Sequence, residues 1–243
     1  MSNIISSGNE LLKFNSDEVI EVSEGLPIPM PTMWLSADVG IVKDGDDKVS
    51  QWQDQSGNDY HAGQASQANK PLLVDGELNG KPVLRFSDNN MLDVSFDTVF
   101  SQPFVFFIVF KTNTNSRSVI ISSDAVLATG IDVDISNFSS PFRYQIRSCN
   151  LYNTLFTSLS LDTYYLTSNV WDGSQGKIYV NSQFASTGNT ATNPIDNTLR
   201  IGARFQNDRY MNGDIAEIIF YNSLLSNPQR QSVEQYLMTK YAL

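Results

Sequence analysis

Short runs of aromatic and β-branched residues alternate with clusters of Asn, Gly, Asp and Ser from Trp34 onward. This pattern is typical of β-strands bounded by turns. The longest apolar run, FVFFIVF at residues 104–110, predicts a strand buried on both faces. Because the runs recur at regular spacing without helical segments between them, they predict an antiparallel β-sandwich. The expected strands span residues 49–53, 82–86, 92–96, 104–111, 118–123, 142–147, 164–171, 177–181, 198–201 and 215–221.

One helix is expected, near the C-terminal end. Ser226 and Gln229 have the spacing of a capping box, and Pro228 suits the first turn of a helix. The apolar side chains that follow fall on one helical face: Val233, Tyr236, Leu237 and Tyr241. We expect this face to pack against the sandwich, and docking into the groove of a partner protein is the alternative.

The first 33 residues differ in pattern from the rest of the chain. Short apolar groups separated by polar and acidic residues fill the first 25 positions, and LPIPMP follows at residues 26–31. Alternating prolines fix φ and remove backbone donors, so this stretch is expected to be extended. We therefore divide the chain into an N-terminal arm with a proline-rich connector, residues 1–33, and a body, residues 34–243.

The composition excludes several classes of function. Hydrophobic residues make up 41% of the 243 positions, which is enough for a core without disulfide staples. The net charge of −10 argues against a nucleic-acid groove, because such a groove needs clustered Lys and Arg. The chain has one Cys, Cys149, and one His, His61. A Cys/His zinc site, a disulfide framework and a haem-attachment motif are thereby excluded.

The N-terminal sequence does not have the features of a secretory signal, which are a basic start, a long apolar run and a small-residue cleavage site. No stretch approaches the roughly 18 uninterrupted apolar residues of a membrane-spanning helix. We therefore expect a soluble protein without membrane insertion and without the general secretory signal.

Six strings of residues carry a resemblance to a known family. They are WLSAD (34–38), VSQWQDQSGNDYHA (49–62), NGKPVLRF (79–86), KIYVN (177–181), LRIGA (199–203) and NGDIAEIIFYN (212–222). In order and spacing they resemble the laminin-G-like domains of the concanavalin A-like lectin/glucanase superfamily, over about residues 34–243. The resemblance implies a two-sheet antiparallel jelly roll with a short C-terminal helix, and the N-terminal arm lies outside it.

The resemblance also implies a range of functions. Such domains are typically non-catalytic, bind carbohydrate or protein ligands or serve as structural appendages, and sometimes hold a calcium ion. They recur in secreted bacterial enzymes, adhesins and phage structural proteins. Because one fold hosts many functions, the site residues must decide among these.

Calcium is the cofactor that the pattern suggests. Asp54, Asn58 and Asp214 carry oxygen atoms at positions that match the turn and last-strand motifs of the family. Ca²⁺ takes six to eight such oxygens at roughly 2.3–2.6 Å. The alternative is that Asp54 and Asn58 cap their own turn, and that Asp214 hydrogen-bonds the backbone.

Sugar or protein contact is expected where aromatic rings lie among polar loop residues. Tyr152 and Tyr210 lie in such stretches, and Arg204 and Arg209 add hydrogen-bond donors near Tyr210. We take these four as candidate ligand-binding residues. The wider set of candidate aromatic residues also contains Tyr60, Tyr144, Phe156 and Phe205, and the alternative is that most aromatic side chains fill the sandwich.

No catalytic residue is predicted. The hydrolases of the superfamily carry Glu-x-Asp-x-Glu or a similar string on one strand face, and the sequence has no such string. Asp132 and Asp134 share a strand face without a third carboxylate, and we interpret them as surface or turn residues. Asp214 and Glu217 are three residues apart, so on a regular strand they would face opposite sides.

These observations favour a non-catalytic binding or structural module. The expected setting is a virion, in which the module is a decoration protein or a tail or fibre appendage. Residues 1–33 would dock on other assembly proteins, an oligomeric arrangement would follow, and the body would contact a host glycan. A glycan-active hydrolase of the same superfamily and a free carbohydrate-binding lectin remain as alternatives.

Overall fold

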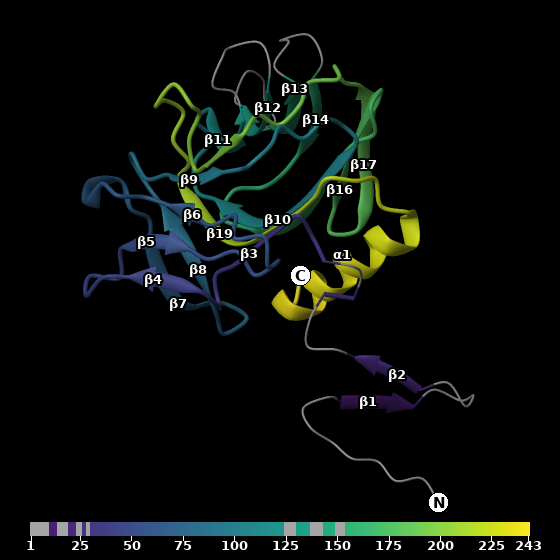
Figure 1. Cartoon of the computed structure of the whole chain (residues 1–243), viewed down its shortest axis with the longest axis horizontal. Coiled ribbons are helices and arrows are strands. Elements are labelled where there is room, and N and C mark those ends of the chain that lie inside the picture. The colour runs from purple at the N-terminus through teal and green to yellow at the C-terminus, as the bar shows by residue number, and fades with distance from the viewer. Residues whose placement is uncertain are drawn as a thin grey trace, which may run out of the picture.

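The computed structural model describes residues 10–13, 19–22, 26–27, 30–123, 130–136, 143–148 and 154–243. Its body is a sandwich of two curved antiparallel sheets (Figure 1). This confirms the predicted all-β jelly roll with a short C-terminal helix. At the N-terminal side, β1 (Glu10–Lys13) and β2 (Val19–Val22) pair antiparallel with each other. The remainder of the predicted arm lies mostly outside the described residues, and its docking on a partner stays a prediction.

The first sheet has eight strands. Along the sheet they are β17 (Gln183–Asn189), β16 (Gln175–Val180), β15 (Tyr164–Trp171), β10 (Phe104–Thr112), β19 (Gly213–Tyr221), β8 (Lys81–Phe86) and β7 (Leu72–Leu78), with β3 (Met33–Ser36) also paired to β19. The central strands β10 and β19 are almost entirely buried because both faces of the sheet are covered.

The second sheet has nine strands. In order they are β14 (Thr154–Ser158), β13 (Arg143–Ser148), β12 (Ile131–Ser136), β11 (Ser118–Ser122), β18 (Thr198–Ile201), β9 (Leu92–Ser95), β6 (Ala62–Gly63), β5 (Val49–Trp52) and β4 (Ile41–Lys43). A short 3₁₀ turn, Gln67–Asn69, links β6 to β7. Chain neighbours β10 and β11 lie in different sheets, which is how a jelly roll stacks its two layers.

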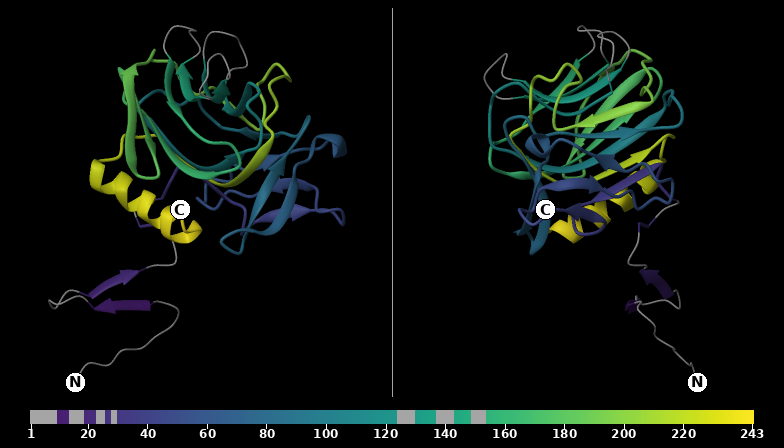
Figure 2. Two further views of the ribbon diagram at one scale, coloured as in Figure 1. Left: turned by 180° about the vertical axis from the view of Figure 1, so that it is seen from behind. Right: turned by 60° about the vertical axis from the view of Figure 1, so that its left-hand side comes forward.

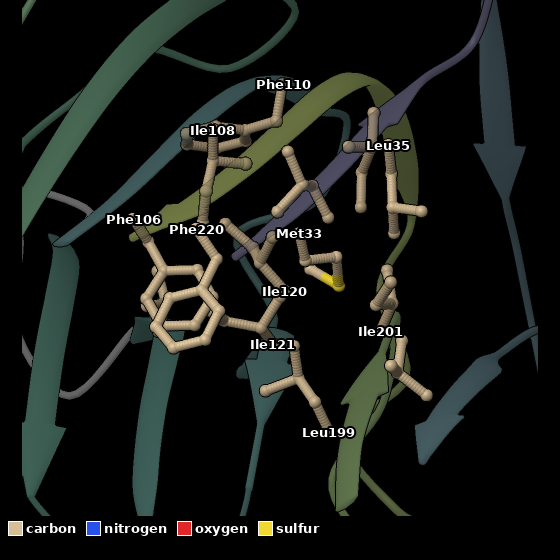
Figure 3. Packing of buried hydrophobic residues seen from close by; sticks show 14 of the residues in the cluster. Met33, Leu35, Phe106, Ile108, Phe110, Ile120, Ile121, Leu199, Ile201 and Phe220 are labelled. Carbon is tan, nitrogen blue, oxygen red and sulfur yellow. The ribbon is translucent and has the colours of Figure 1, made fainter. Parts of the chain in front are cut away.

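The main core fills the space between the sheets. Strand period two directs every second residue inward, so Phe106, Ile108 and Phe110 leave β10 on the core side. They meet Ile121 from β11 and Ile201 from β18 across the sandwich (Figure 3). Within the first sheet the Phe106 ring stacks on that of Phe220, with centroids 4.5 Å apart. Each such fully buried side chain contributes about 1.5–3 kcal/mol to the free energy of folding.

Helix α1 (Asn227–Tyr241) covers the outer face of the eight-stranded sheet (Figure 2). Ser226 and Gln229 form the predicted capping box, and Ala242 ends the helix in the left-handed conformation. Val233, Leu237 and Tyr241 are buried in a second apolar cluster with residues of β10 and β19. The expected packing of the helix on the sandwich is therefore confirmed. Among the described residues, no helix is long and apolar enough to cross a membrane.

One expectation about β19 is wrong. Asp214 and Glu217 face the same side of the sheet, the side that α1 covers, although they are three residues apart. The register opposite β10 shifts between Val109, which pairs with Glu217, and Phe110, which pairs with Ile215. This β-bulge inserts one extra residue into β19, and the insertion restores both carboxylates to one face.

Candidate functional site

The outer face of the nine-stranded sheet is polar where strands β11 to β14 gather at one end of the body (Figure 1). Strand β12 alternates strictly, because Ile131, Val133 and Ile135 enter the core and leave Asp132 and Asp134 on the opposite face. Antiparallel register places Arg147 opposite Asp132 and Gln145 opposite Asp134. We define the polar face as Ser122, Asp132, Asp134, Arg143, Gln145, Arg147 and Phe156.

A row of polar side chains extends this face across the sheet. Ser122 on β11 is opposite both Asp132 on β12 and Arg200 on β18. Arg200 is in turn opposite Asp93 on β9, and its Nε and Nη2 donate to the two carboxylate oxygens at 2.7 and 2.9 Å. Directly opposite residues share a face in a sheet, so acidic, basic and hydroxyl groups follow one another from β9 to β13.

Arg147 holds the two carboxylates of β12 together. Its Nη2 donates to Oδ2 of Asp132 at 2.8 Å and also to Oδ2 of Asp134. All three side chains are nearly or fully buried, so the sequence interpretation of the two aspartates as surface or turn residues is wrong. Burial raises the pKa of Asp134 to about 6, although the charge of Arg147 acts in the opposite direction.

Three oxygen atoms of the polar face lack a hydrogen-bond partner among the described residues. They are Oγ of Ser122 and the Oδ1 atoms of Asp132 and Asp134, all of them buried. A buried polar group left without a partner costs about 1–3 kcal/mol, so such groups are rare and require an explanation. All three oxygens can accept hydrogen bonds, which makes this face suited to a ligand that donates them.

An exposed aromatic ring lies on the same face, two strands away from Asp134. Phe156 on the edge strand β14 is opposite Gln145 and remains 45% exposed. The guanidinium of Arg143 lies 3.9 Å from the centroid of the Phe156 ring, which restricts the ring's orientation. An apolar ring next to hydrogen-bonding side chains suits a sugar, whose ring faces are apolar and whose edges carry hydroxyls.

The structure brings two of the predicted ligand-binding residues to this face. The loop at residues 202–212 passes alongside β11, where the N–H of Val119 donates to the carbonyl of Arg209 at 2.8 Å. Val119 is opposite Asp134, so Arg209 lies next to the buried carboxylates. Arg204 donates from Nε and Nη2 to both oxygens of Asp208, each at 2.8 Å. Tyr210 is half-buried in the same loop, and Tyr152 lies outside the described residues.

Asp54 and Asn58 lie together in the turn after β5. Asp54 accepts hydrogen bonds from the Trp34 N–H at 2.7 Å and from the Ser56 hydroxyl at 2.6 Å. The side-chain amide of Asn58 donates to the Thr32 carbonyl at 3.0 Å. These bonds tie the turn to the segment leading into β3, which is the capping role that sequence analysis left open.

Asp214 lies in a separate ion network. Its carboxylate accepts hydrogen bonds from Nε of Arg85 at 2.7 Å and from the Tyr164 hydroxyl at 2.7 Å, and it forms an ion pair with Nζ of Lys111 at 2.8 Å. Burial pushes the pKa of Asp214 upward, but these hydrogen bonds outweigh burial and leave the pKa lowered. A carboxylate that already neutralises two cations has little charge left for a third.

The three candidate calcium ligands are not brought together. Asp54 forms an isolated antiparallel β-bridge with Leu35, and Leu35 is opposite Ile218 on β19. Ile218 is four residues along β19 from Asp214. Four residues of strand correspond to about 13 Å. Within the described residues, no group of three or more His, Cys, Asp or Glu side chains is arranged to hold a metal ion. Calcium binding stays a prediction.

The fold is that of a two-sheet antiparallel β-sandwich of the jelly-roll type. A family model described as the concanavalin A-like lectin/glucanases superfamily, of the laminin G type, matches residues 105–229. The chain belongs to this superfamily. No curated protein matches the sequence significantly.

Solved structures share the fold at low sequence identity. A GH54 α-L-arabinofuranosidase is 14% identical over 80% of this chain and 51% of its own, with a TM-score of 0.64. The botulinum neurotoxin serotype D binding domain is 14% identical over 86% and 51%, with a TM-score of 0.61. This chain thus spans about half the length of those two chains.

A third similar structure is matched over most of its own chain and most of this one. Domain 4 of AbnA, a GH43 extracellular arabinanase from Geobacillus stearothermophilus, was solved in complex with arabinotriose. It is 14% identical over 85% of this chain and 97% of its own, with a TM-score of 0.58. These similarities establish the fold, and a virion role stays a prediction.

Proposed function

We propose that this protein is a non-catalytic glycan-binding module whose ligand occupies the polar face. The observation that carries the proposal is the set of buried oxygens on Ser122, Asp132 and Asp134 without partners among the described residues. Sugar hydroxyls would donate to these oxygens, and the exposed ring of Phe156 would pack against a sugar ring.

The similar structures support a carbohydrate ligand by analogy of fold. Domain 4 of AbnA was solved with arabinotriose, and the neurotoxin serotype D ligand-binding domain with N-acetylneuraminic acid. The two sugars differ in chemistry, so the fold does not dictate the ligand. The residues on the polar face must therefore determine which sugar is bound.

The arrangement of carboxylates argues against hydrolysis. Glycoside hydrolysis needs one carboxyl group as acid and a second, independent one as base or nucleophile. Here Asp132 and Asp134 both bind the same guanidinium, that of Arg147, and Ser136 occupies the next outward position of β12. A hydrolase is the second candidate, favoured by the Asp134 pKa of about 6, which suits a general acid.

Binding experiments test the proposal. The full chain is screened on a glycan array, and the affinities of the bound glycans are measured by calorimetry for Asp132→Asn and Phe156→Ala. Each substitution should weaken binding about tenfold, in line with the loss of one buried hydrogen bond or one stacked ring. Phe184→Ala is the matched control, because Phe184 is 60% exposed on the edge strand β17 of the other sheet.

Two outcomes would contradict this function. One is the absence of any bound glycan across the array, and the other is an unchanged affinity in both polar-face variants. Reproducible cleavage of a bound glycan, abolished in Asp134→Asn, would favour the hydrolase instead.

Attachment to a larger assembly, a virion among the options, is proposed from the sequence of residues 1–33. The antiparallel pair β1 and β2 supports it in one respect, because a hairpin offers strand edges for pairing. Deleting residues 1–25 should abolish recovery of the protein with its assembly, and unchanged recovery would refute the attachment role.

A further inference from the structure

The sequence contains two Asn-Gly dipeptides, and the structure gives them opposite surroundings. Asn79 and Gly80 form the two-residue turn between β7 and β8. Asn212 directly precedes β19, whose first residue, Gly213, is paired with β10 on one side and with β8 on the other. The same dipeptide therefore lies at the tip of a hairpin in one place and inside a sheet in the other.

The turn at Asn79 is open to solvent. Both of its residues are exposed, and a Cβ placed on Gly80 would meet no atom within 4 Å. The φ values of Asn79 and Gly80, +49° and +73°, are those of a type I′ hairpin turn. The peptide group of Gly80 therefore has room to rotate toward the side chain of Asn79 with little disturbance of the sheet.

The second dipeptide is held in place. Gly213 is buried, and a Cβ on it would lie 2.1 Å from the carbonyl oxygen of Lys111. The carbonyl of Asn212 accepts hydrogen bonds from the Asn113 N–H at 2.9 Å and from the Thr112 hydroxyl at 3.4 Å. Rotation of this peptide requires β19 to separate from its neighbours. Opening in a central strand costs up to the full stability of the fold, whereas an exposed turn opens at almost no cost.

The side chain of Asn79 also connects its turn to helix α1. Nδ2 of Asn79 donates to the carbonyl of Lys240, in the last turn of the helix, at 3.1 Å. The carbonyls at a helix C-terminus carry partial negative charge and lack partners within the helix, so an amide donor stabilises that end. In the same helical turn, Nζ of Lys240 and the hydroxyl of Tyr241 each lie 2.7 Å from Oε2 of Glu217. Asn79 therefore supports the end of the helix that binds this buried carboxylate.

We infer that Asn79 is a site of spontaneous deamidation, and that its conversion weakens the attachment of α1 to the sheet. The backbone nitrogen of Gly80 attacks Cγ of Asn79 and forms a cyclic imide. The side-chain nitrogen leaves as ammonia, which takes up the proton that the attacking nitrogen loses. Water then opens the ring at either carbonyl and yields aspartate or isoaspartate. One water is consumed for each ammonia released, and no oxidant or reductant is required.

Either product is unsuited to its neighbours. A carboxylate at position 79 has no hydrogen to donate, and the partial negative charge at the end of the helix repels it. Isoaspartate in addition places an extra carbon in the main chain of the turn, whose length fixes the register of β7 and β8. Both products therefore loosen the last turn of α1.

Peptide mapping of the aged protein tests the site. The full chain is kept in mildly alkaline buffer, and mass spectrometry follows the conversion of Asn79 and Asn212 in the same samples. Asn79 should convert at least about ten times faster than Asn212, because the second site reacts only when β19 opens. The same chain in urea is the reference, since both sites are open there and should convert at similar rates.

The substitution Asn79→Asp reproduces one product and tests the connection to the helix. It should lower the melting temperature and speed the hydrogen exchange of backbone amides at residues 237–241. Asn189→Asp is the matched control, because Asn189 is exposed on the edge strand β17 and the substitution adds the same charge. This control should melt and exchange like the wild type.

Three results would overturn the inference. Equal conversion of Asn79 and Asn212 in the folded chain removes the effect of their surroundings. Conversion of Asn79 in urea but not in the folded chain shows that the turn protects it. Melting and exchange of Asn79→Asp that match those of Asn189→Asp remove the connection to α1. The proposed glycan binding stands or falls separately, because β7 and β8 belong to the eight-stranded sheet and the polar face to the other.

Discussion

Nη2 of Arg147 lies 2.8 Å from Oδ2 of Asp132, the residue directly opposite it across β12 and β13. The same nitrogen contacts Asp134, two residues further along β12. One cation therefore compensates two buried carboxylates on the outer face of the sheet. A shared partner of this kind makes the three side chains interdependent, and their substitution effects will not be additive.

Loss of Arg147 should strongly destabilise the fold. Arg147→Met keeps much of the side-chain volume but leaves two buried carboxylates without their cation, which costs about 3–5 kcal/mol. Urea denaturation measures this change. The double variant Arg147→Met with Asp134→Asn should recover part of the loss, because one of the two charges is then absent. A loss below about 1 kcal/mol in the single variant would show that the network contributes little.

The raised pKa of Asp134 predicts a specific pH dependence. Between its ordinary value of 3.8 and about 6, the folded protein keeps a proton that the unfolded chain releases. Stability therefore falls as the pH rises through this window. Asp134→Asn does not titrate, so it should gain up to about 3 kcal/mol on the wild type between pH 4 and pH 7. Urea denaturation across this range checks the difference.

Asp214 provides the contrasting case for that measurement. Its pKa is lowered, so its ionised form stabilises the fold above pH 3.8, and this stabilisation is lost as the pH falls. The wild type should therefore lose its advantage over Asp214→Asn on acidification. Parallel slopes for Asp134→Asn and Asp214→Asn would contradict the opposite environments of the two carboxylates.

Two glycines with nearly equal φ should differ in their tolerance of alanine. Gly202 has a φ of +86° and Gly57 one of +87°. A Cβ on Gly202 would lie 2.4 Å from a ring carbon of Phe86, whereas a Cβ on Gly57 would meet no atom within 4 Å. Gly57→Ala should cost about 1 kcal/mol from backbone strain alone. Gly202→Ala should cost about 1–3 kcal/mol more from the clash. Equal melting temperatures would refute the steric argument.

Arg209→Gly should separate stability from binding. Glycine adopts a φ of +54° without steric strain, and after allowing for its greater freedom in the unfolded chain we expect a gain of about 0.5–1 kcal/mol. Under the proposed function the same variant should bind the glycan ligand less tightly, because the guanidinium is absent. Thermal unfolding and calorimetry on one preparation test both parts. Reduced stability would indicate that the side chain of Arg209 supports the loop.

The elements that the sequence predicts well are those with an unmistakable local signal. The run at residues 104–111 matches β10 because both faces of that strand are apolar. The helix begins at the predicted capping box because Ser226 and Gln229 satisfy each other locally. Strand β12 was not among the expected strands, although IDVDIS alternates with period two. There the outward residues are acidic, and their burial depends on other strands.

The candidate site depends on pairings that sequence spacing does not encode. The partner of Asp132 is Arg147, fifteen residues along the chain, and only the register of β12 and β13 makes them neighbours. The proximity of Arg209 to Asp134 follows from a loop that binds Val119. Arg204 and Arg209 were identified as hydrogen-bond donors near an aromatic residue. This signal indicates residues able to contact a ligand, but it does not show which other residues lie next to them in the fold.

Strand β12 alternates residue by residue between the interior of the sandwich and the polar face. The proposed contacts with a ligand and the contacts within the core are therefore made by separate, alternating residues of one short strand. Under the proposed function, point substitutions at the acidic positions would change the preferred sugar while the apolar positions keep the two sheets packed. A single insertion or deletion in β12 would instead disrupt the fold. It would exchange the outward acidic positions with the inward apolar positions and bring carboxylates into the interior.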